Sequence, residues 1–444
     1  MRLFVLSTLW VVFALTASTV TAEPDQAALA NTLRADIDGL YADVESLYVD
    51  LHRNPELSLL EEKTALKLAE RMRKLGYEVT TKVGGTGVVA ILKNGPGPTL
   101  LVRTDMDALP VLEKTGLPYA STVTMKDAVT GETVPVMHAC GHDVHMAAWI
   151  GTATILARRR DLWHGTLEFI GQPAEERVRG AKAMLADGLF TRFPKPDMAL
   201  GIHDHDTTPS GTVGVVPGYI MANADSVDLT FYGTGGHGAY PDTTVDPIVI
   251  ASRFVVAMQT IISREKDPFE PAVITVGSFH GGAKHNIIPD VVKLQLTVRS
   301  YKPEVRERLL AAIERIAKAE AMAALAPKEP DMKVIESTRA TYNDPALTER
   351  VARAMRAAIG DGNLTQPPME MGSEDFSEFY GAGVPSVFLW IGAVEPKKFA
   401  AAKAGGPALP STHSPYFAPD LVPTLRTAIL AETVAALAMI NPER

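Results

Sequence analysis

The stretch that decides the fold reads TLEFIGQPAEE at residues 166–176, a short mainly apolar run that ends in turn residues and two carboxylates. A run of this length between turn signals is typical of a strand buried in a sheet. Similar runs alternate with helical patterns along the chain. We predict strands at 88–92, 99–102, 166–170, 198–202 and 384–391, and helices at 26–75 (two), 145–158, 181–187, 346–359 and 421–439. This alternation predicts an α/β domain with a mainly parallel sheet covered on both faces.

The order of predicted elements changes between residues 226 and 335. Strands are predicted at 226–231, 272–279, 291–298 and 332–335, with helices at 246–263 and 303–326. The order βαββαβ is typical of a ferredoxin-like α+β sandwich, which is complete in itself. Because α/β alternation resumes afterwards, we predict an inserted domain at 223–338 in a larger domain formed by 23–222 and 339–444.

Composition limits the class of protein and its partners. With 444 residues, of which 46% are hydrophobic and 21% charged, the chain can bury a large core and form two domains. The formal net charge is -9, and Lys and Arg form no long basic stretch. Nucleic acid and anionic membrane are therefore not predicted partners.

The N-terminus has the pattern of an export signal. Met1 and Arg2 precede an apolar run at 3–15, and Val20-Thr21-Ala22 offers a small-residue cleavage site. The apolar run is shorter than the roughly 20 residues that span a bilayer. We predict that residues 1–22 are removed and that the protein is periplasmic or secreted. We expect no later segment to be long enough to cross a membrane.

The single cysteine, Cys140, cannot form an internal disulfide, so in an exported protein it must be buried or occupied. It lies in HACGHDVH at residues 138–145, which combines one thiol with three imidazoles and a carboxylate. Thiolate and imidazole are ligands that zinc and similar ions prefer, and Gly141 would let the backbone bend between Cys140 and His142. We therefore predict a metal site here.

Three further groups of ligand-type residues follow predicted strands or lie in late loops. They are the Glu175-Glu176 pair, GIHDH at 201–205 and STHSP at 411–415. Considered alone, the Glu175-Glu176 pair could equally lie at the solvent-exposed start of a helix, where the helix dipole favours negative charge. Open α/β sheets bind ligands at the carboxyl ends of their strands, and ligands spread over four loops suit a hydrolytic pair of ions better than one structural ion.

These motifs resemble a family of dinuclear metallopeptidases that includes aminoacylases and bacterial glutamate carboxypeptidases. The nearer branch is its amidohydrolases, the hippurate hydrolases and plant auxin-conjugate hydrolases. The resemblance rests on residues 51–57, 103–110, 138–145, 175–176, 235–241, 286–290 and 372–376. It implies a catalytic domain of phosphorylase/hydrolase type and an inserted lid and dimerisation domain.

The resemblance also implies a role for each site residue. Cys140 would bridge two divalent ions, His142 and His203 would complete one site, Glu176 and His413 would complete the other, and Glu175 would be the general base. His237 would reach the active site of a partner subunit in a homodimer or higher homo-oligomer, and Asn286 and Arg299 would bind the substrate carboxylate. Zinc is the first expectation for the ions, and manganese, cobalt or nickel would also suit these ligands.

Two departures from the family pattern bear on the metal ligands. Arg103-Thr104-Asp105 stands where peptidase branches carry a His-x-Asp ligand motif, so His142 would have to supply an imidazole instead. Asp105 and Asp107 are then expected to support ligands rather than bind metal. Asp204 and His205 follow His203 directly and could compete with it for an ion.

The activity implied is hydrolysis of the amide bond in N-acyl amino acids or short peptide-like amides, by a metal-bridging hydroxide with Glu175 as its base. One alternative is a thiol hydrolase that uses Cys140 as nucleophile with His142 or His145 as its base. Another is a non-catalytic exported protein that binds a metal or solute. The choice of acyl group and amino acid depends on pocket-wall residues outside these motifs.

Overall fold

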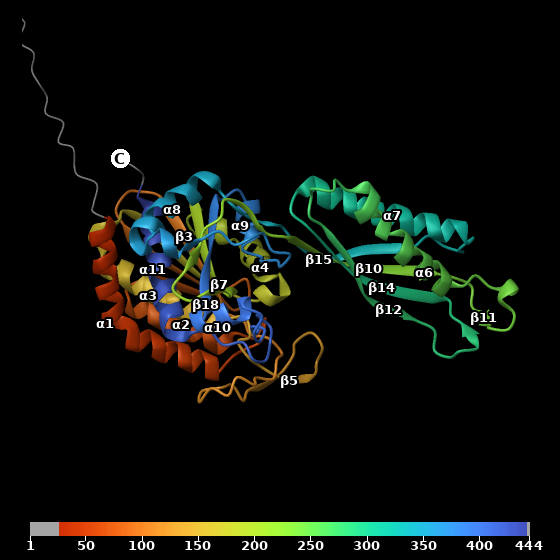
Figure 1. Cartoon of the computed structure of the whole chain (residues 1–444), viewed down its shortest axis with the longest axis horizontal. Helices are drawn as coiled ribbons and strands as arrows, with labels where there is room; N and C mark the ends of the chain where they lie inside the picture. Colours follow the sequence, from red (N-terminus) through yellow and green to blue (C-terminus); the bar gives the residue numbers. More distant parts are fainter. Residues whose placement is uncertain (1–25, 442–444) are drawn as a thin grey trace, which may run out of the picture.

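The computed structural model describes residues 26–441 and shows two bodies joined side by side (Figure 1). The larger body is an α/β domain, and the smaller is an elongated sheet with helices on one face. The predicted signal peptide at residues 1–22 lies outside the described residues. The fold class expected from the sequence is confirmed.

An eight-stranded mixed sheet forms the centre of the larger body. Its order is β1 (Glu78–Val83), β2 (Gly87–Asn94), β6 (Gly165–Gln172), β3 (Thr99–Asp105), β7 (Met198–Pro209), β18 (Ser386–Val394), β8 (Val213–Gly214) and β17 (Leu364–Thr365). Strands β6, β3, β7 and β18 pair in parallel, whereas β1, β2 and β6 pair antiparallel. The sequence did not predict β1, because its EVTTKV run is half exposed and lacks a strong apolar pattern.

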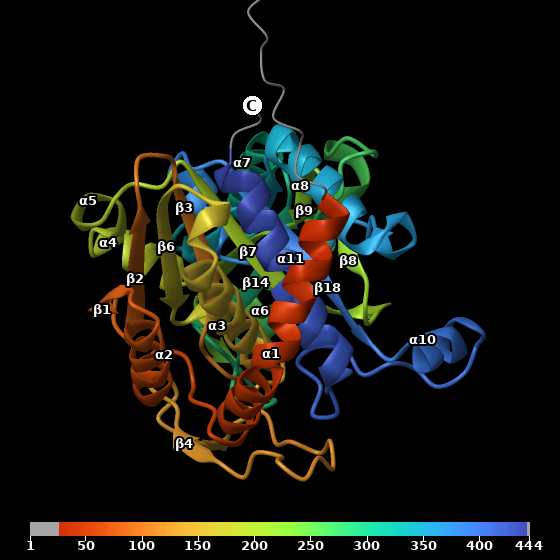
Figure 2. The same ribbon diagram turned by 90° about the vertical axis from the view of Figure 1, so that its left-hand side faces the viewer.

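Helices cover both faces of this sheet (Figure 2). One layer contains α1 (Gln26–Arg53), α2 (Glu62–Lys74), α3 (His142–Arg158), α8 (Pro345–Ile359) and α11 (Leu421–Ile440). The other contains α4 (Gly180–Ala186), α5 (Leu189–Arg192) and α9 (Ser377–Gly381). In β3, Leu100 and Val102 face the first layer and Leu101 faces the second, so both faces of the strand are buried. This explains the continuous apolar runs in the sequence.

Helix α3 begins at His142, three residues before the predicted start. Gly141, the residue before it, has φ +77°, a left-handed conformation that glycine adopts without a steric penalty. The bend expected at Gly141 is therefore present. It places His142 and His145 in the first turn of the helix, three residues apart and on one side.

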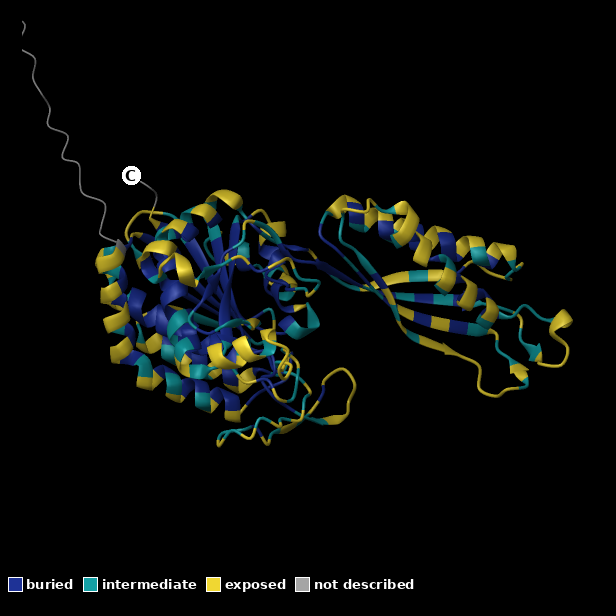
Figure 3. Ribbon diagram, in the orientation of Figure 1, coloured by how far each residue is buried: buried dark blue, intermediate teal, exposed yellow. Residues whose placement is uncertain are grey.

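The smaller body is the segment from Asn223 to Thr338. Its elements are β10 (Asn223–Tyr232), α6 (Pro247–Ala257), β12 (Val273–Gly281), β14 (Val291–Ser300), α7 (Pro303–Ala323) and β15 (Asp331–Thr338). The four strands are antiparallel in the order β12-β14-β10-β15, and both helices pack on one face. Buried and exposed residues alternate along these strands (Figure 3), as expected for a sheet with one covered face.

The remaining short elements connect or extend the two bodies. They are β4 (Thr124–Lys126), β5 (Thr133–Pro135), β9 (Gly218–Met221), β11 (Gly236–His237), β13 (Ile287–Ile288), β16 (Thr341–Asn343) and α10 (Pro396–Lys403). Strands β9 and β16 pair with each other where the chain enters and leaves the smaller body. The predicted helix at 246–263 ends earlier, at Ala257, and a π-helical turn follows at Ile261–Glu265.

Two helical segments of the described chain, Pro247–Glu265 and Leu421–Ile440, are long and apolar enough to cross a membrane by length and composition. The expectation that no later segment reaches this length was therefore wrong. In Leu421–Ile440, 67% of the apolar window is buried against the sheet and its neighbouring helices. This burial is typical of a core helix, and Pro247–Glu265 in turn covers the sheet of the smaller body.

Candidate metal centre

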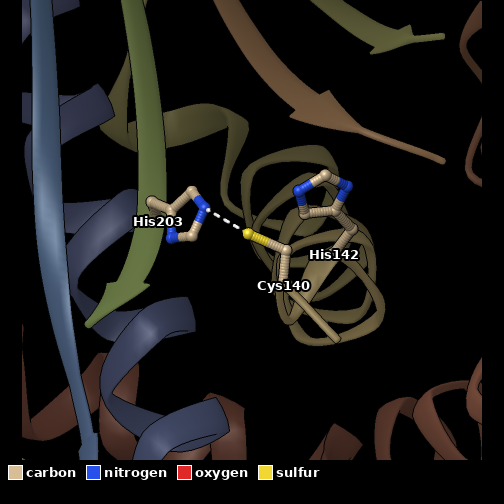
Figure 4. A group of neighbouring side chains, drawn as sticks. All are labelled: Cys140, His142 and His203. Carbon is tan, nitrogen blue, oxygen red and sulfur yellow. Dashed lines mark hydrogen bonds between the residues drawn. The ribbon is translucent and has the colours of Figure 1, made fainter. Parts of the chain in front are cut away.

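The five side chains predicted as metal ligands lie together in two groups that share Cys140. Cys140 and His142 lie at the start of α3, Glu176 on the turn after β6, His203 within β7 and not past its end as predicted, and His413 in the loop before α11. Cys140 Sγ is 3.5 Å from His203 Nε2, with His142 beside them (Figure 4). Potential ligand atoms of Cys140, His142 and His203 all lie within 4.8 Å of one another, and so do those of Cys140, Glu176 and His413. The two groups share the sulfur atom, as a bridging ligand would require.

The two imidazoles beside the sulfur are oriented by backbone carbonyls. His142 Nδ1 lies 2.7 Å from the carbonyl oxygen of Asp107, and His203 Nδ1 lies 2.6 Å from that of Asp204. Each Nδ1 therefore donates its proton and leaves the Nε2 lone pair directed at the cluster. His142 Nε2 and Glu176 Oε1 are buried and have no hydrogen-bond partner in the protein.

Burial and the neighbouring carboxylates shift the pKa values of the cluster. Burial raises the pKa of the Cys140 thiol well above its usual value, and Glu176 and Glu175 raise it further. Burial also raises the pKa of Glu176 to about 7. Burial lowers the pKa of His142, but Asp105 and Asp107 more than offset this and bring it to about 9. A thiol, three imidazoles and a carboxylate, two of whose possible ligand atoms are buried without a hydrogen-bond partner, fit a pair of divalent cations.

Glu175 lies on a short 3₁₀ turn, Glu175–Arg177, directly after β6. Its Oε2 is 3.9 Å from His142 Nε2, so its carboxylate borders the cluster. Burial raises the pKa of Glu175 well above the ordinary value, and the charges of Glu374 and Glu176 add to the effect. Such a carboxylate has a high affinity for a proton, which suits a general base.

The sequence did not predict the role of Arg103. This fully buried guanidinium lies 2.7 Å from Glu374, 2.7 Å from Asp105 and 3.3 Å from Asp375, and it also donates to Gln172 at 3.0 Å. Arg103 therefore ties the loop at 372–376 to β3 and β6. The only sequence signal was an arginine inside an apolar strand, where a peptidase would carry a ligand histidine.

Asp204 and His205, which follow His203 in β7, contact other side chains of the site. Asp204 Oδ1 is 3.0 Å from His145 Nε2, and His145 Nδ1 is 2.8 Å from Asp105. His205 Nε2 is 2.7 Å from Glu370, while the hydroxyls of Thr207 and Thr208 lie near its Nδ1. His205 therefore supports Glu370 rather than the sulfur site. Asp204 supports His145 through Oδ1, but its buried Oδ2 has no partner, and Asp204, His203 and His145 form a further group that could hold an ion.

The cluster opens into a cleft of about 500 Å³ between the two bodies. Its walls include Cys140, Glu175, Glu176 and His413 from the larger body and Arg299 from the smaller. The Arg299 guanidinium is partly buried and donates to the carbonyl oxygen of Met371 at 3.3 Å. No carboxylate of the described residues lies within ion-pair distance of it, so it is available to an anionic ligand.

Comparison with known proteins agrees with this geometry. Residues 101–420 match the model of peptidase family M20/M25/M40. Thermostable carboxypeptidase 2 of Saccharolobus solfataricus is 36% identical over 83% of this chain and 91% of its own length. The chain belongs to this family. It is also 36% identical to the hippurate hydrolase of Campylobacter jejuni, over 74% of this chain and 82% of that protein.

A solved M20-family structure supports the dinuclear character of the site. A dinuclear metal-binding peptidase of Bacillus subtilis superposes with a TM-score of 0.73 at 28% identity, covering 91% of this chain and all of that one. The protein is therefore a metal-dependent hydrolase that binds a dinuclear metal centre. The thiol-nucleophile alternative is disfavoured, because burial and the neighbouring carboxylates raise the pKa of Cys140, whereas a nucleophilic thiol needs a lowered one.

His237 and Asn286, which the family resemblance assigns to the active site, do not line this cleft. His237, in β11, pairs with Ile287 in β13, and the carbonyl oxygen of Asn286 accepts from Gly238 N–H at 2.9 Å. Strand β11 lies at the end of the smaller body that points away from the larger one (Figure 1), and the hydrogen bond from Gly238 places Asn286 beside this strand. A single chain therefore does not bring His237 or Asn286 to the cleft that contains Cys140.

Proposed function

We propose that this protein is an exported M20-family amidohydrolase that cleaves N-acyl amino acids or short peptide-like amides. The observation that carries the proposal is the position of Glu175, 3.9 Å from the unpartnered Nε2 of His142 at the edge of the two ligand groups that share Cys140. The names of the carboxypeptidase and hippurate hydrolase relatives agree with cleavage of an amide next to a carboxylate.

Different residues of the cleft would bind the metal ions, transfer the proton and bind the substrate. Cys140, His142, His203, Glu176 and His413 would hold two divalent ions, which would polarise the amide carbonyl and acidify the attacking water. Glu175 accepts the proton of that water and returns it to the departing amine, consistent with its raised pKa. Arg299 binds the carboxylate of the substrate, since a guanidinium can bind it with two parallel hydrogen bonds.

The complete site would require a second copy of the chain. His237 and Asn286 lie at the far end of the smaller body, so they can act only on the cleft of a partner. We assign His237 to the oxyanion of the reacting amide and Asn286 to the substrate carboxylate. Mixing His237→Ala protein with Glu175→Gln protein should then restore about a quarter of wild-type activity through mixed dimers. Absence of recovery in verified mixed dimers would exclude this assignment.

Zinc is our choice for the resident ion, because a thiolate ligand favours it over harder cations, with manganese, cobalt and nickel as competitors. The export signal predicts a mature chain that begins at Glu23 in the periplasm or outside the cell. Metal analysis of the protein purified without added metal tests the choice of zinc. N-terminal sequencing of the protein from each cell fraction tests the cleavage before Glu23 and the export.

The function itself is tested by measuring release of free amine from a panel of N-acyl amino acids and dipeptides. Metal-free protein would be reconstituted with each of the four metals. Activity should require added metal and disappear on chelation. Glu175→Gln should retain both ions but lose about 10²–10⁴-fold in kcat. Full activity of the metal-free protein, or of Glu175→Gln, would refute the proposed chemistry.

A further inference from the structure

The turn that carries Glu175 has an unusual backbone. Ala174, before the turn, has φ +50°, and Val178, after it, has φ +48°. Left-handed conformations are unfavourable for residues that have a Cβ atom, and most of all for β-branched valine. Such strain persists only where surrounding contacts impose it, and it is found preferentially at functional sites.

Three consecutive backbone amides of this turn are held by carboxylates from outside it. Ala174 N–H donates to Glu61 Oε1 at 2.8 Å, Glu175 N–H to Asp107 Oδ1 at 3.1 Å, and Glu176 N–H to Asp107 Oδ2 at 3.0 Å. The turn is closed from within by Val178 N–H, which donates to the carbonyl oxygen of Glu175 at 2.6 Å. Of the two flanking left-handed residues, Ala174 is therefore the one held by an external side chain.

Glu61 is itself fixed in place. It lies between α1 and α2, is fully buried, and is 113 positions from Ala174 in the sequence. Its Oε1 also accepts from Leu59 N–H at 2.9 Å, and its Oε2 accepts from the hydroxyl of Thr86 at 2.6 Å. The Glu61 carboxyl thus accepts three hydrogen bonds inside the protein, where hydrogen bonds are stronger than in water, and these fix its position.

We propose that Glu61 is a positioning residue for the general base. It holds the Ala174 peptide in its left-handed conformation and so keeps the Glu175 carboxylate directed at the metal cluster. Asp107 accepts from the next two backbone amides, so Glu61 and Asp107 together fix the backbone at residues 174–176. The inference rests on the proposed role of Glu175 in amide hydrolysis.

The test compares three variants of the holoenzyme with a matched control. Glu61→Ala should lower kcat at least tenfold while KM and the number of bound ions stay at wild-type values. Glu61→Gln should retain most activity, because its amide oxygen can still accept from Ala174 N–H. Adding Ala174→Gly to Glu61→Ala should recover part of the loss, because glycine adopts the left-handed conformation without help.

Glu56→Ala is the control. Glu56 is also buried in the segment between α1 and α2, but its Oε2 accepts from Thr64 N–H at 2.8 Å. It should leave kcat within about twofold of wild type. In the same holoenzyme preparations, hydrogen exchange at the backbone amides of residues 174–176 should be faster in Glu61→Ala than in Glu56→Ala, which reports on the turn independently of activity.

The outcomes separate this inference from the proposed function. If the wild-type enzyme releases no amine from any substrate, the proposed function fails. If the wild-type enzyme is active and Glu61→Ala matches its kcat, the positioning role is wrong. Parallel loss of bound metal and kcat in Glu61→Ala, without rescue by Ala174→Gly, would show a general structural role and would also overturn the inference.

Discussion

Replacing Gly141 with alanine tests how one backbone position supports the metal centre. Gly141 has φ +77°, and a Cβ atom added there would lie 2.5 Å from the carboxylate carbon of Asp204. That distance is too short for two non-bonded carbon atoms. Asp204 would have to move, and its Oδ1 would lose its place 3.0 Å from His145 Nε2.

Two contributions set the size of the expected effect. Placing alanine in a left-handed conformation costs about 1–2 kcal/mol. Displacing a buried carboxylate from a charge-assisted hydrogen bond costs about 1.5–3 kcal/mol more. We therefore expect Gly141→Ala to lower the free energy of unfolding by about 2.5–5 kcal/mol. It should also weaken metal binding, because Asp204 Oδ1 lies 3.2 Å from Nδ1 of the ligand His203.

Gly76→Ala is the matched control. Gly76 has φ +88°, but apart from its two chain neighbours no described residue has an atom within 4 Å of the added Cβ, so only the backbone contribution of about 1–2 kcal/mol applies. Urea unfolding of the metal-free proteins, followed by tryptophan fluorescence, would measure both variants. Trp149, Trp163 and Trp390 are all buried in the catalytic domain and report on its unfolding. Equal destabilisation by the two variants would refute the argument about Asp204.

Three further predictions concern charges around the sheet. Burial raises the pKa of Glu168 to about 8, so the folded protein keeps a proton that the unfolded chain has lost above about pH 4.5. The free energy of unfolding should therefore fall as the pH rises from about 5 to 8. In denaturation experiments at several pH values, Glu168→Gln should make this fall smaller. An unchanged dependence of the free energy of unfolding on pH would contradict the prediction. Arg103→Lys should destabilise the protein by about 3–5 kcal/mol in urea unfolding, because an ammonium group cannot satisfy three buried carboxylates at once; a loss below about 1 kcal/mol would argue against this. Asp206 Oδ2 accepts from Thr412 N–H at 2.7 Å and so fixes the loop of His413. Asp206→Ala should weaken one of two metal-binding steps about 10–100-fold in calorimetry, whereas Asp206→Asn should not; equal affinities for both variants would exclude this role.

Much of the fold was predictable because it depends on local patterns. Continuous apolar runs mark strands buried on both faces, such as β3 and β7, and the order of elements in the smaller body follows the βαββαβ pattern. Strand β1 was missed, because a polar edge strand is stabilised mainly by pairing with its neighbour β2. The start of α3 was misplaced, because it depends on the conformation of Gly141 rather than on hydrophobic periodicity.

The ligands of the metal centre were predictable because thiol and imidazole rarely gather without chemical reason. The residues that hold this site in place, such as Arg103 and Glu61, were not predictable from the sequence. Arg103 contacts Glu374, which is 271 positions away in the sequence, and Glu61 contacts Ala174, which is 113 positions away. No local pattern reports such contacts. The left-handed conformation of Ala174 is likewise imposed by tertiary contacts, since nothing in the residue type favours it.

Anomalous diffraction from crystals of the zinc-loaded protein, measured at the metal absorption edge, tests the central claim most directly. We predict two peaks about 3.5–4 Å apart, each about 2.3 Å from Cys140 Sγ. His142 and His203 should face one peak, and Glu176 and His413 the other. A single peak, or peaks that do not share the sulfur, would contradict the shared-thiolate centre on which the proposed chemistry depends.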